Sequence, residues 1–287
     1  MWQLQKIADE GTAEPFIARL WTGVLDLRDV LFRHKTSSEA DYVAHCRCFD
    51  DLYIPVLEAL SSARQHSRAI KELIGNHRAK LASGSIVSYQ QHAVQINESI
   101  GSSLHKEFSG FLSTAVRAAK LFQHVLSYLN VNVDFLFQKP QRFTKGLTQL
   151  HTAGMTELAD YLDKTRSGWS DTLVQRRNNL EHEGWRLPDV RYIQKPSGVV
   201  TVIEPEVDGR PVTEFVSYMQ DRLFAFVEEL LAYAVQRGIA GFADVVEIPK
   251  EKRDPKNVIR FRVSVSAIEP EACFWRLRYN ERGFQDS

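Results

Sequence analysis

The sequence has little cysteine, no net charge and no long apolar run. Its 287 residues include three cysteines, and thirty-six basic residues balance thirty-six acidic ones. An odd, low cysteine count does not build a disulfide framework, so we expect reduced thiols in a cytoplasmic protein. A zero net charge gives no overall attraction to nucleic acid or to a membrane. Because no apolar run approaches about 18 residues and the start lacks a signal-peptide pattern, we expect no membrane partner.

Several signatures of enzyme chemistry are also missing. The sequence has no G-x-x-x-x-G-K-[ST] loop, so we predict no hydrolysis of nucleoside triphosphates. Its nine histidines form no H-E-x-x-H spacing, and Cys46 and Cys48 have no second Cys or His pair to complete a metal site. We therefore expect no metal and no cofactor.

The first three-fifths of the chain has the periodicity of amphipathic helices. Apolar residues recur at steps of three and four, which places them on one helical face. Ser170 is a better N-cap than Ser167 for the last of these helices, because the acidic Asp171 follows it. Gly184 is a natural stop for the same helix. The predicted helices span 15–34, 38–74 with a kink or break at Pro55, 96–129, 143–162 and 170–183.

The remainder of the chain mixes strands with one more helix. The turn signals Pro196-Ser197-Gly198 and Asp208-Gly209 predict a short hairpin or meander, and a helix follows over Thr213–Arg237. Alternating residues predict a strand over Ile259–Val265 and a second over Cys273–Tyr279. The expected fold is mainly α, a helical bundle with a small C-terminal β element. We expect residues 1–190 to form the bundle and residues 191–287 to pack on it as one structural unit.

A polar stretch, "VQRRNNLEHEGW" (Val174–Trp185), stands at the end of the last bundle helix. Asn178 and His182 are four residues apart and therefore share one helical face. Arg177 and Glu181 have the same spacing and could simply pair with each other. Arg177 and His182 are separated by about 140° around an ideal helix, so they are not natural neighbours. Composition alone favours a solvated helix end over a functional site.

The same residues carry a family resemblance. The run from Arg177 to His182 resembles the R-x(4–6)-H motif of the HEPN superfamily, which favours Asn, Asp or His directly after the arginine. It lies on a late helix of a helical chain, as in HEPN domains, and the resemblance extends over about residues 89–237. Gly184 stands where some HEPN toxins have a tyrosine, so the resemblance gives no support to an antitoxin-paired role.

The resemblance implies metal-independent cleavage of RNA, in a bacterial defence or stress role. In such chemistry the 2′-hydroxyl attacks the neighbouring phosphate, which requires a base, an acid and a cation. His182 would be the base or acid, Arg177 would hold the phosphate, and Asn178 would orient the ribose, the phosphate or His182. One histidine cannot easily serve as acid and base in one step, so we expect a homodimer, as HEPN domains typically form. The expected substrate-binding residues are Arg176, Asn179 and Arg186.

Other interpretations stay open. The chain could be a HEPN-like module that binds RNA, a nucleotide or a protein partner without catalysis, or a structural helical protein in which the motif occurs by chance. Glu98 or Glu107 could orient Arg177 across the bundle, although surface charges are the simpler interpretation. A basic row on the C-terminal strands could bind RNA phosphates or be an ordinary solvated face; its members are Arg260, Arg262, Arg276 and Arg278.

Overall fold

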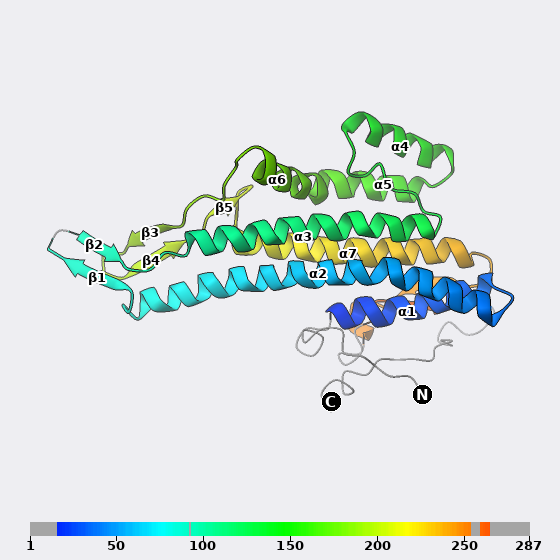
Figure 1. Ribbon diagram of the computed structural model, residues 1–287, viewed down its shortest axis with the longest axis horizontal. Coiled ribbons are helices and arrows are strands. Elements are labelled where there is room, and N and C mark those ends of the chain that lie inside the picture. Colours follow the sequence, from blue (N-terminus) through cyan, green and yellow to red (C-terminus); the bar gives the residue numbers. More distant parts are fainter. Residues whose placement is uncertain (1–15, 92, 254–258, 265–287) are drawn as a thin grey trace, which may run out of the picture. The chain divides into compact units, whose positions relative to one another are not determined.

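The computed structural model describes residues 16–91, 93–253 and 259–264, which are mainly helical (Figure 1). The helices are α1 (Phe16–Lys35), α2 (Glu39–Ala82), α3 (Gly101–Tyr128), α4 (Pro140–Thr152), α5 (Thr156–Thr165), α6 (Asp171–His182) and α7 (Val212–Ile239). A π-helical turn (Arg166–Ser170) connects α5 to α6, and a 3-10 turn (Lys250–Lys252) lies between the last two strands. The mainly-α class with small β elements, expected from the sequence, is confirmed.

The strands pair as four antiparallel two-stranded sheets. They are β1 (Val87–Gln90) with β2 (Ala93–Ile96), β3 (Arg191–Gln194) with β4 (Val200–Ile203), β5 (Glu206–Val207) with β6 (Arg210–Pro211), and β7 (Asp244–Glu247) with β8 (Phe261–Ser264). Asp208 and Gly209 both have positive φ, 52° and 74°, as a two-residue hairpin turn of this kind requires. The predicted turns at Gly198 and Gly209 are confirmed, whereas the second predicted C-terminal strand lies outside the described residues.

Two local predictions were wrong, and one of two alternatives is excluded. The helix expected from residue 96 starts only at Gly101, because Ile96 is the last residue of strand β2 and a short connection of residues 97–100 follows it. The single helix expected over 143–162 is divided into α4 and α5 at Gly154, whose φ is +74°. Of the kink or break expected at Pro55, the break is excluded, because α2 continues through this residue.

The expected N-cap at Ser170 was also wrong. Ser170 has helical backbone angles (φ −74°, ψ −30°), and its side chain makes no capping hydrogen bond. The helical backbone instead runs from α5 through the π turn into α6, so α6 has no free N-terminus to cap. A π turn inserts an extra residue into a helix, and periodicity over so short a segment does not reveal it.

The chain forms two compact units built from interleaved segments. Unit 1 takes the described parts of Met1–Ser61, Ala118–Gly146 and Phe224–Ser287, and unit 2 takes Ser62–Arg117 and Leu147–Leu223, apart from residue 92. The three longest helices, α2, α3 and α7, contribute residues to both units.

Unit 1 has an aromatic and aliphatic core. The rings of Phe122 on α3 and Phe226 on α7 meet edge to face, with their centroids 5.9 Å apart. Tyr53 on α2 is fully buried, and its hydroxyl donates to the backbone carbonyl of Leu20 on α1 at 2.9 Å. Burial of these large side chains from several segments stabilises the unit, because each removes extensive apolar surface from water.

Unit 2 holds the polar stretch singled out in the sequence. Phe108 on α3 is fully buried and contacts Phe215 on α7 and Trp185 after α6, with ring centroids 5.9 and 6.1 Å apart. The next residue toward the N-terminus of α3, Glu107, pairs with His66 of α2 at 2.8 Å. These contacts fix α3 as the element against which the end of α6 is placed.

Candidate functional site

The α6 helix ends where the sequence predicted. Gly184 has a φ of +68°, a left-handed conformation that terminates helices and that glycine adopts without strain. The backbone N–H groups of Glu183 and Trp185 both donate to the carbonyl of Asn179, at 3.0 and 3.1 Å. Leu173 is the buried residue of α6, so this helix presents an unusually polar surface. His182 therefore lies in the last turn, at the edge of solvent.

Arg177 forms the intrahelical pair that its spacing allowed. Its Nη2 lies 2.6 Å from Oε2 of Glu181, and both side chains are 28% exposed. The Nη1 of Arg177 also donates to the side-chain oxygen of Asn178 at 3.1 Å. The guanidinium group is thus held by two neighbours on its own helix while remaining accessible to solvent.

Glu181 connects groups that helical geometry alone would keep apart. Its Oε1 accepts a hydrogen bond from the hydroxyl of Ser113 on α3 at 3.1 Å. The Nε2 of His182 lies 3.9 Å from Oε2 of Glu181, the oxygen that also binds Arg177. We call Ser113, Arg177, Glu181 and His182 the Glu181 cluster. One carboxylate in this cluster lies between an arginine and a histidine, and a serine from α3 fixes its position.

The arginine and the histidine of the cluster differ in their freedom. The side chain of His182 is 66% exposed, so its imidazole can reach an approaching ligand. Arg177 is held more firmly and keeps further N–H donors beyond those engaged by Glu181 and Asn178. The arrangement can place a mobile acid or base next to a fixed cation.

Arg176 has a different set of contacts. Its Nε donates to Asp208 in the β5–β6 turn at 2.9 Å, and its Nη2 forms a second, very short contact with the same carboxylate. These hydrogen bonds raise the pKa of Arg176. Its guanidinium carbon also lies 5.6 Å from the ring centre of Trp185. Arg176 therefore connects α6 to the β5–β6 turn, and a ligand would have to compete with Asp208 for it.

The other two residues expected to bind substrate lie near the same end of α6. The amide of Asn179, oriented with its nitrogen toward both acceptors, donates to the carbonyl of Gln175 and to the carboxylate of Glu183, at 2.9 and 3.1 Å. Arg186 is exposed just beyond the glycine stop. A role for either residue in binding substrate stays a prediction.

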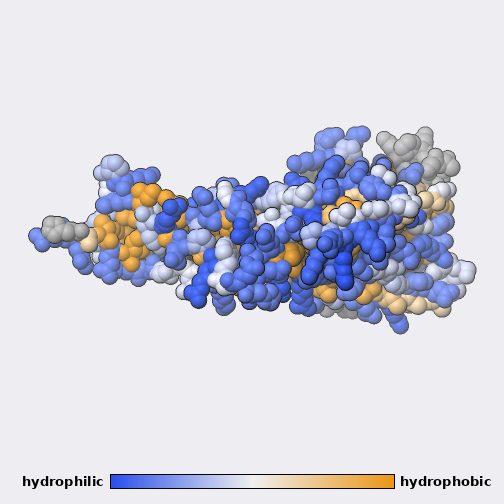
Figure 2. All heavy atoms as spheres, turned by 90° about the horizontal axis from the view of Figure 1, so that it is seen from above, coloured by the Kyte–Doolittle hydropathy of each residue, from blue (hydrophilic) through white to orange (hydrophobic). Residues whose placement is uncertain are grey.

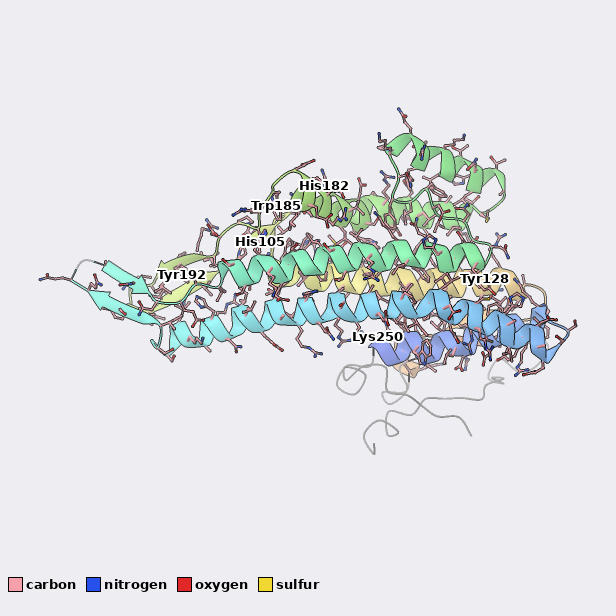
Figure 3. The ribbon with its side chains drawn as sticks, viewed as in Figure 1. His105, Tyr128, His182, Trp185, Tyr192 and Lys250 are labelled. Atoms are coloured by element: carbon pink, nitrogen blue, oxygen red, sulfur yellow. The ribbon has the colours of Figure 1, made fainter. Side chains whose placement is uncertain are left out.

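Two aromatic groups near the end of α6 were not among the residues expected from the sequence. Trp185 packs against Phe108, and one turn earlier on α3 the Nδ1 of His105 accepts a hydrogen bond from the backbone N–H of Leu187 at 3.4 Å. Figure 3 shows His182, Trp185 and His105 along one stretch of the molecule, on α6, the segment after it and α3. Helical spacing could not reveal this proximity, because α3 precedes α6 by many residues.

The carboxylates considered as partners for Arg177 contact other groups. Glu98 pairs with Lys80 at 2.6 Å and Glu107 pairs with His66, so neither takes the alternative role of orienting Arg177. The carboxylate that contacts Arg177 is that of Glu181. The reason is distance along the chain: an i,i+4 partner is available without any tertiary contact.

The expected basic row on the C-terminal strands is only partly described. Arg260 forms ion pairs with Glu228, Glu229 and Glu247, at 3.7, 2.7 and 2.8 Å. Its charge is therefore compensated within unit 1, which argues against its use for RNA phosphates. Arg276 and Arg278 lie outside the described residues.

Comparison with known proteins gave no guide to the site: no family model, no curated protein and no solved structure matches the chain. Within the described ranges, no group of three or more His, Cys, Asp or Glu side chains is arranged to hold a metal ion. Over the same ranges, no helix combines the length and the apolar character that crossing a membrane would require.

Proposed function

We propose that this chain is a HEPN-like endoribonuclease that cleaves RNA without a metal ion, with Arg177 and His182 as its catalytic residues and a stress or defence role. One observation carries the proposal. The carboxylate of Glu181 lies between Arg177 and His182 and contacts both, so the arginine and histidine of the motif belong to one solvent-accessible cluster.

The chemistry follows from the groups present. A base removes the proton from the 2′-hydroxyl, the 2′-oxygen attacks phosphorus, and the bond to the 5′-oxygen breaks as an acid protonates that oxygen. The products are a 2′,3′-cyclic phosphate and a 5′-hydroxyl. His182 supplies one proton transfer, and Arg177 stabilises the charge that develops on the phosphate oxygens. The same histidine of a second copy would supply the other transfer, so the proposal includes a homodimer with both motifs at its interface.

Neighbouring side chains would position these groups. Ser113 and Glu181 hold the guanidinium of Arg177 at the end of α6, and Asn178 contacts the same group. Arg186, which is exposed beyond the helix end, would bind a flanking phosphate.

The proposal is tested with wild-type protein, chelator and two matched substrates. Single-stranded RNA should be cut to products with 2′,3′-cyclic phosphate ends, and DNA of the same sequence should stay intact because it has no 2′-hydroxyl. Sedimentation should give a dimer under the same conditions. Cleavage of the DNA, or RNA products with 5′-phosphate ends, would contradict the proposed chemistry.

A second function is favoured by the pairing of Arg177. Its guanidinium is already compensated by Glu181 at 2.6 Å, which suits a structural arginine in a module that binds RNA, a nucleotide or a protein partner without catalysis. This alternative predicts that the wild-type protein retards RNA in a mobility assay but leaves it uncut, and that Arg186→Gln weakens binding while His182→Ala does not.

A further inference from the structure

The β3–β4 hairpin of unit 2 has one buried face and one open face. On the buried face, Val200 and Val202 join Leu81 and Ile86 in an apolar cluster. Successive side chains of a strand alternate between faces, so the pairing register also determines which side chains lie on the open face. The outer face consists of three neighbouring pairs across the hairpin: Arg191 with Ile203, Ile193 with Thr201, and Lys195 with Val199.

The outer face exposes aliphatic side chains to solvent. Ile193 is 50% exposed and Val199 is 44% exposed. On the neighbouring β1–β2 hairpin, the cross-strand pair Tyr89 and Val94 is also exposed, and the hydroxyl of Tyr89 donates to Gly198 beside Val199. This pair lies on the face of β1–β2 that carries Val87 and Ile96, which pack on the buried face of β3–β4, so it is not part of the outer face. Figure 2 shows apolar atoms gathered at the surface over these hairpins. Clustered exposed aliphatic groups are typical of a surface that binds a partner.

The charges on this surface have one sign. Residues 191–203, which form the hairpin, include Arg191 and Lys195 and no acidic residue. Within the part of the chain that the structure describes, neither Arg191 nor Lys195 forms an ion pair. Both lie on the same face as Ile193, because they are two residues before it and two residues after it in the sequence. The surface therefore combines uncompensated cations with exposed apolar groups.

We propose that the outer face of β3–β4 binds the surface of an anionic lipid bilayer. The aliphatic side chains would enter the interfacial region, while Arg191 and Lys195 extend toward the phospholipid head groups. A second copy is a poorer occupant, since a two-fold contact would bring these cations against each other. Nucleic acid would use the cations but leave Ile193 and Val199 without a partner. The proposal departs from the expectation of no membrane partner, which rested on the zero net charge and the lack of a long apolar run; binding through a local patch requires neither a net charge nor such a run.

The test is co-sedimentation of the full chain with vesicles of phosphatidylcholine alone, or with ~30 mol % phosphatidylserine. Wild-type protein should pellet with the phosphatidylserine vesicles and stay in solution with the others. Arg191→Gln with Lys195→Gln should lower the partition coefficient about fivefold for each charge. Ile193→Ser with Val199→Ser should lower it roughly tenfold, because apolar burial is lost.

A matched pair of substitutions tests whether the loss of any two exposed aliphatic side chains would weaken vesicle binding. Val43→Ser with Ile54→Ser changes the same residue types on α2, where they are 37% and 41% exposed, and should leave binding unchanged. Circular dichroism checks that each variant is folded. Wild-type protein that pellets with neither vesicle, or with both equally, overturns the proposal. If the Gln variant loses RNA binding and the Ser variant keeps it, with no vesicle binding, the face is a nucleic-acid surface instead.

Discussion

Gly146 on α4 is a glycine because unit 1 leaves no room for a side chain there. A Cβ at this position would overlap the ring of Phe135. Alanine normally stabilises a helix interior by about 1 kcal/mol relative to glycine. We expect the overlap to outweigh this gain, so that Gly146→Ala lowers the free energy of unfolding by about 1–3 kcal/mol, as measured by urea denaturation.

Gly75 provides the matched control in the interior of α2. It is exposed, and apart from its chain neighbours and the backbone of its own helical turns, no atom lies within 4 Å of the position that a Cβ would occupy. Gly75→Ala should therefore stabilise the protein by about 0.5–1 kcal/mol, through lower backbone entropy of the unfolded chain. Two changes of the same sign would show that the contact with Phe135 does not decide the outcome.

Substitution of Glu181 should affect the binding of RNA and the rate of cleavage in different ways. Glu181→Gln removes the negative charge next to Arg177, so the guanidinium becomes freer to bind phosphate and KM for RNA should fall. The same change releases Arg177 and His182 from their shared partner, and kcat should fall about tenfold. Steady-state kinetics in chelator measures both. A fall in kcat with a higher KM would mean that Glu181 does not restrain Arg177.

Ser170 distinguishes two descriptions of how α6 begins. A capping serine would make Ser170→Ala cost about 1 kcal/mol. Here the hydroxyl is buried without a hydrogen-bond partner, and the backbone is already helical. We expect Ser170→Ala to be neutral or to stabilise by up to about 1 kcal/mol, because a buried unsatisfied group is removed. A loss of about 1 kcal/mol in urea denaturation would restore the capping role.

The elements that were predicted correctly depend on local patterns. The stop at Gly184, the turn at Asp208-Gly209 and the stripe of α7 all follow from residues close in sequence. The π turn was missed because its signal is one inserted residue. The contact between Ser113 and Glu181 was missed because it depends on how α3 and α6 pack. The pairing of Arg177 with Glu181 was foreseen as one option, since it depends only on the helical period.

At the scale of the molecule, ion pairs connect distant segments of unit 1. Glu228 on α7 lies 2.5 Å from Arg19 on α1 and 3.7 Å from Arg260 next to β8. Burial raises the pKa of Glu228, although the charges of Arg19 and Arg260 oppose this shift. The carboxyl group of Glu228 therefore binds its proton more tightly in the folded chain than in the unfolded chain. The stability contributed by the protonated carboxyl is lost as pH rises from the ordinary pKa through the raised one.

Glu228→Gln removes that titration while preserving the shape of the side chain. The melting temperature of the variant, relative to wild type, should therefore increase as pH rises above the ordinary carboxyl pKa of about 4.3. Glu58→Gln, at an exposed position of α2, should show no such trend. If Glu228→Gln instead becomes relatively less stable as pH rises, the attraction of the two arginines outweighs the cost of burial.

The central proposal, that Arg177 and His182 cleave RNA, is tested most directly by comparing cleavage rates in chelator at saturating RNA. The controls are Arg117→Ala and His151→Ala, which change an exposed arginine and an exposed histidine elsewhere in unit 2. We predict that Arg177→Ala and His182→Ala each lower the rate by about 100-fold or more, while both controls keep the wild-type rate. Full activity in His182→Ala, or an equal loss in His151→Ala, would contradict the assignment.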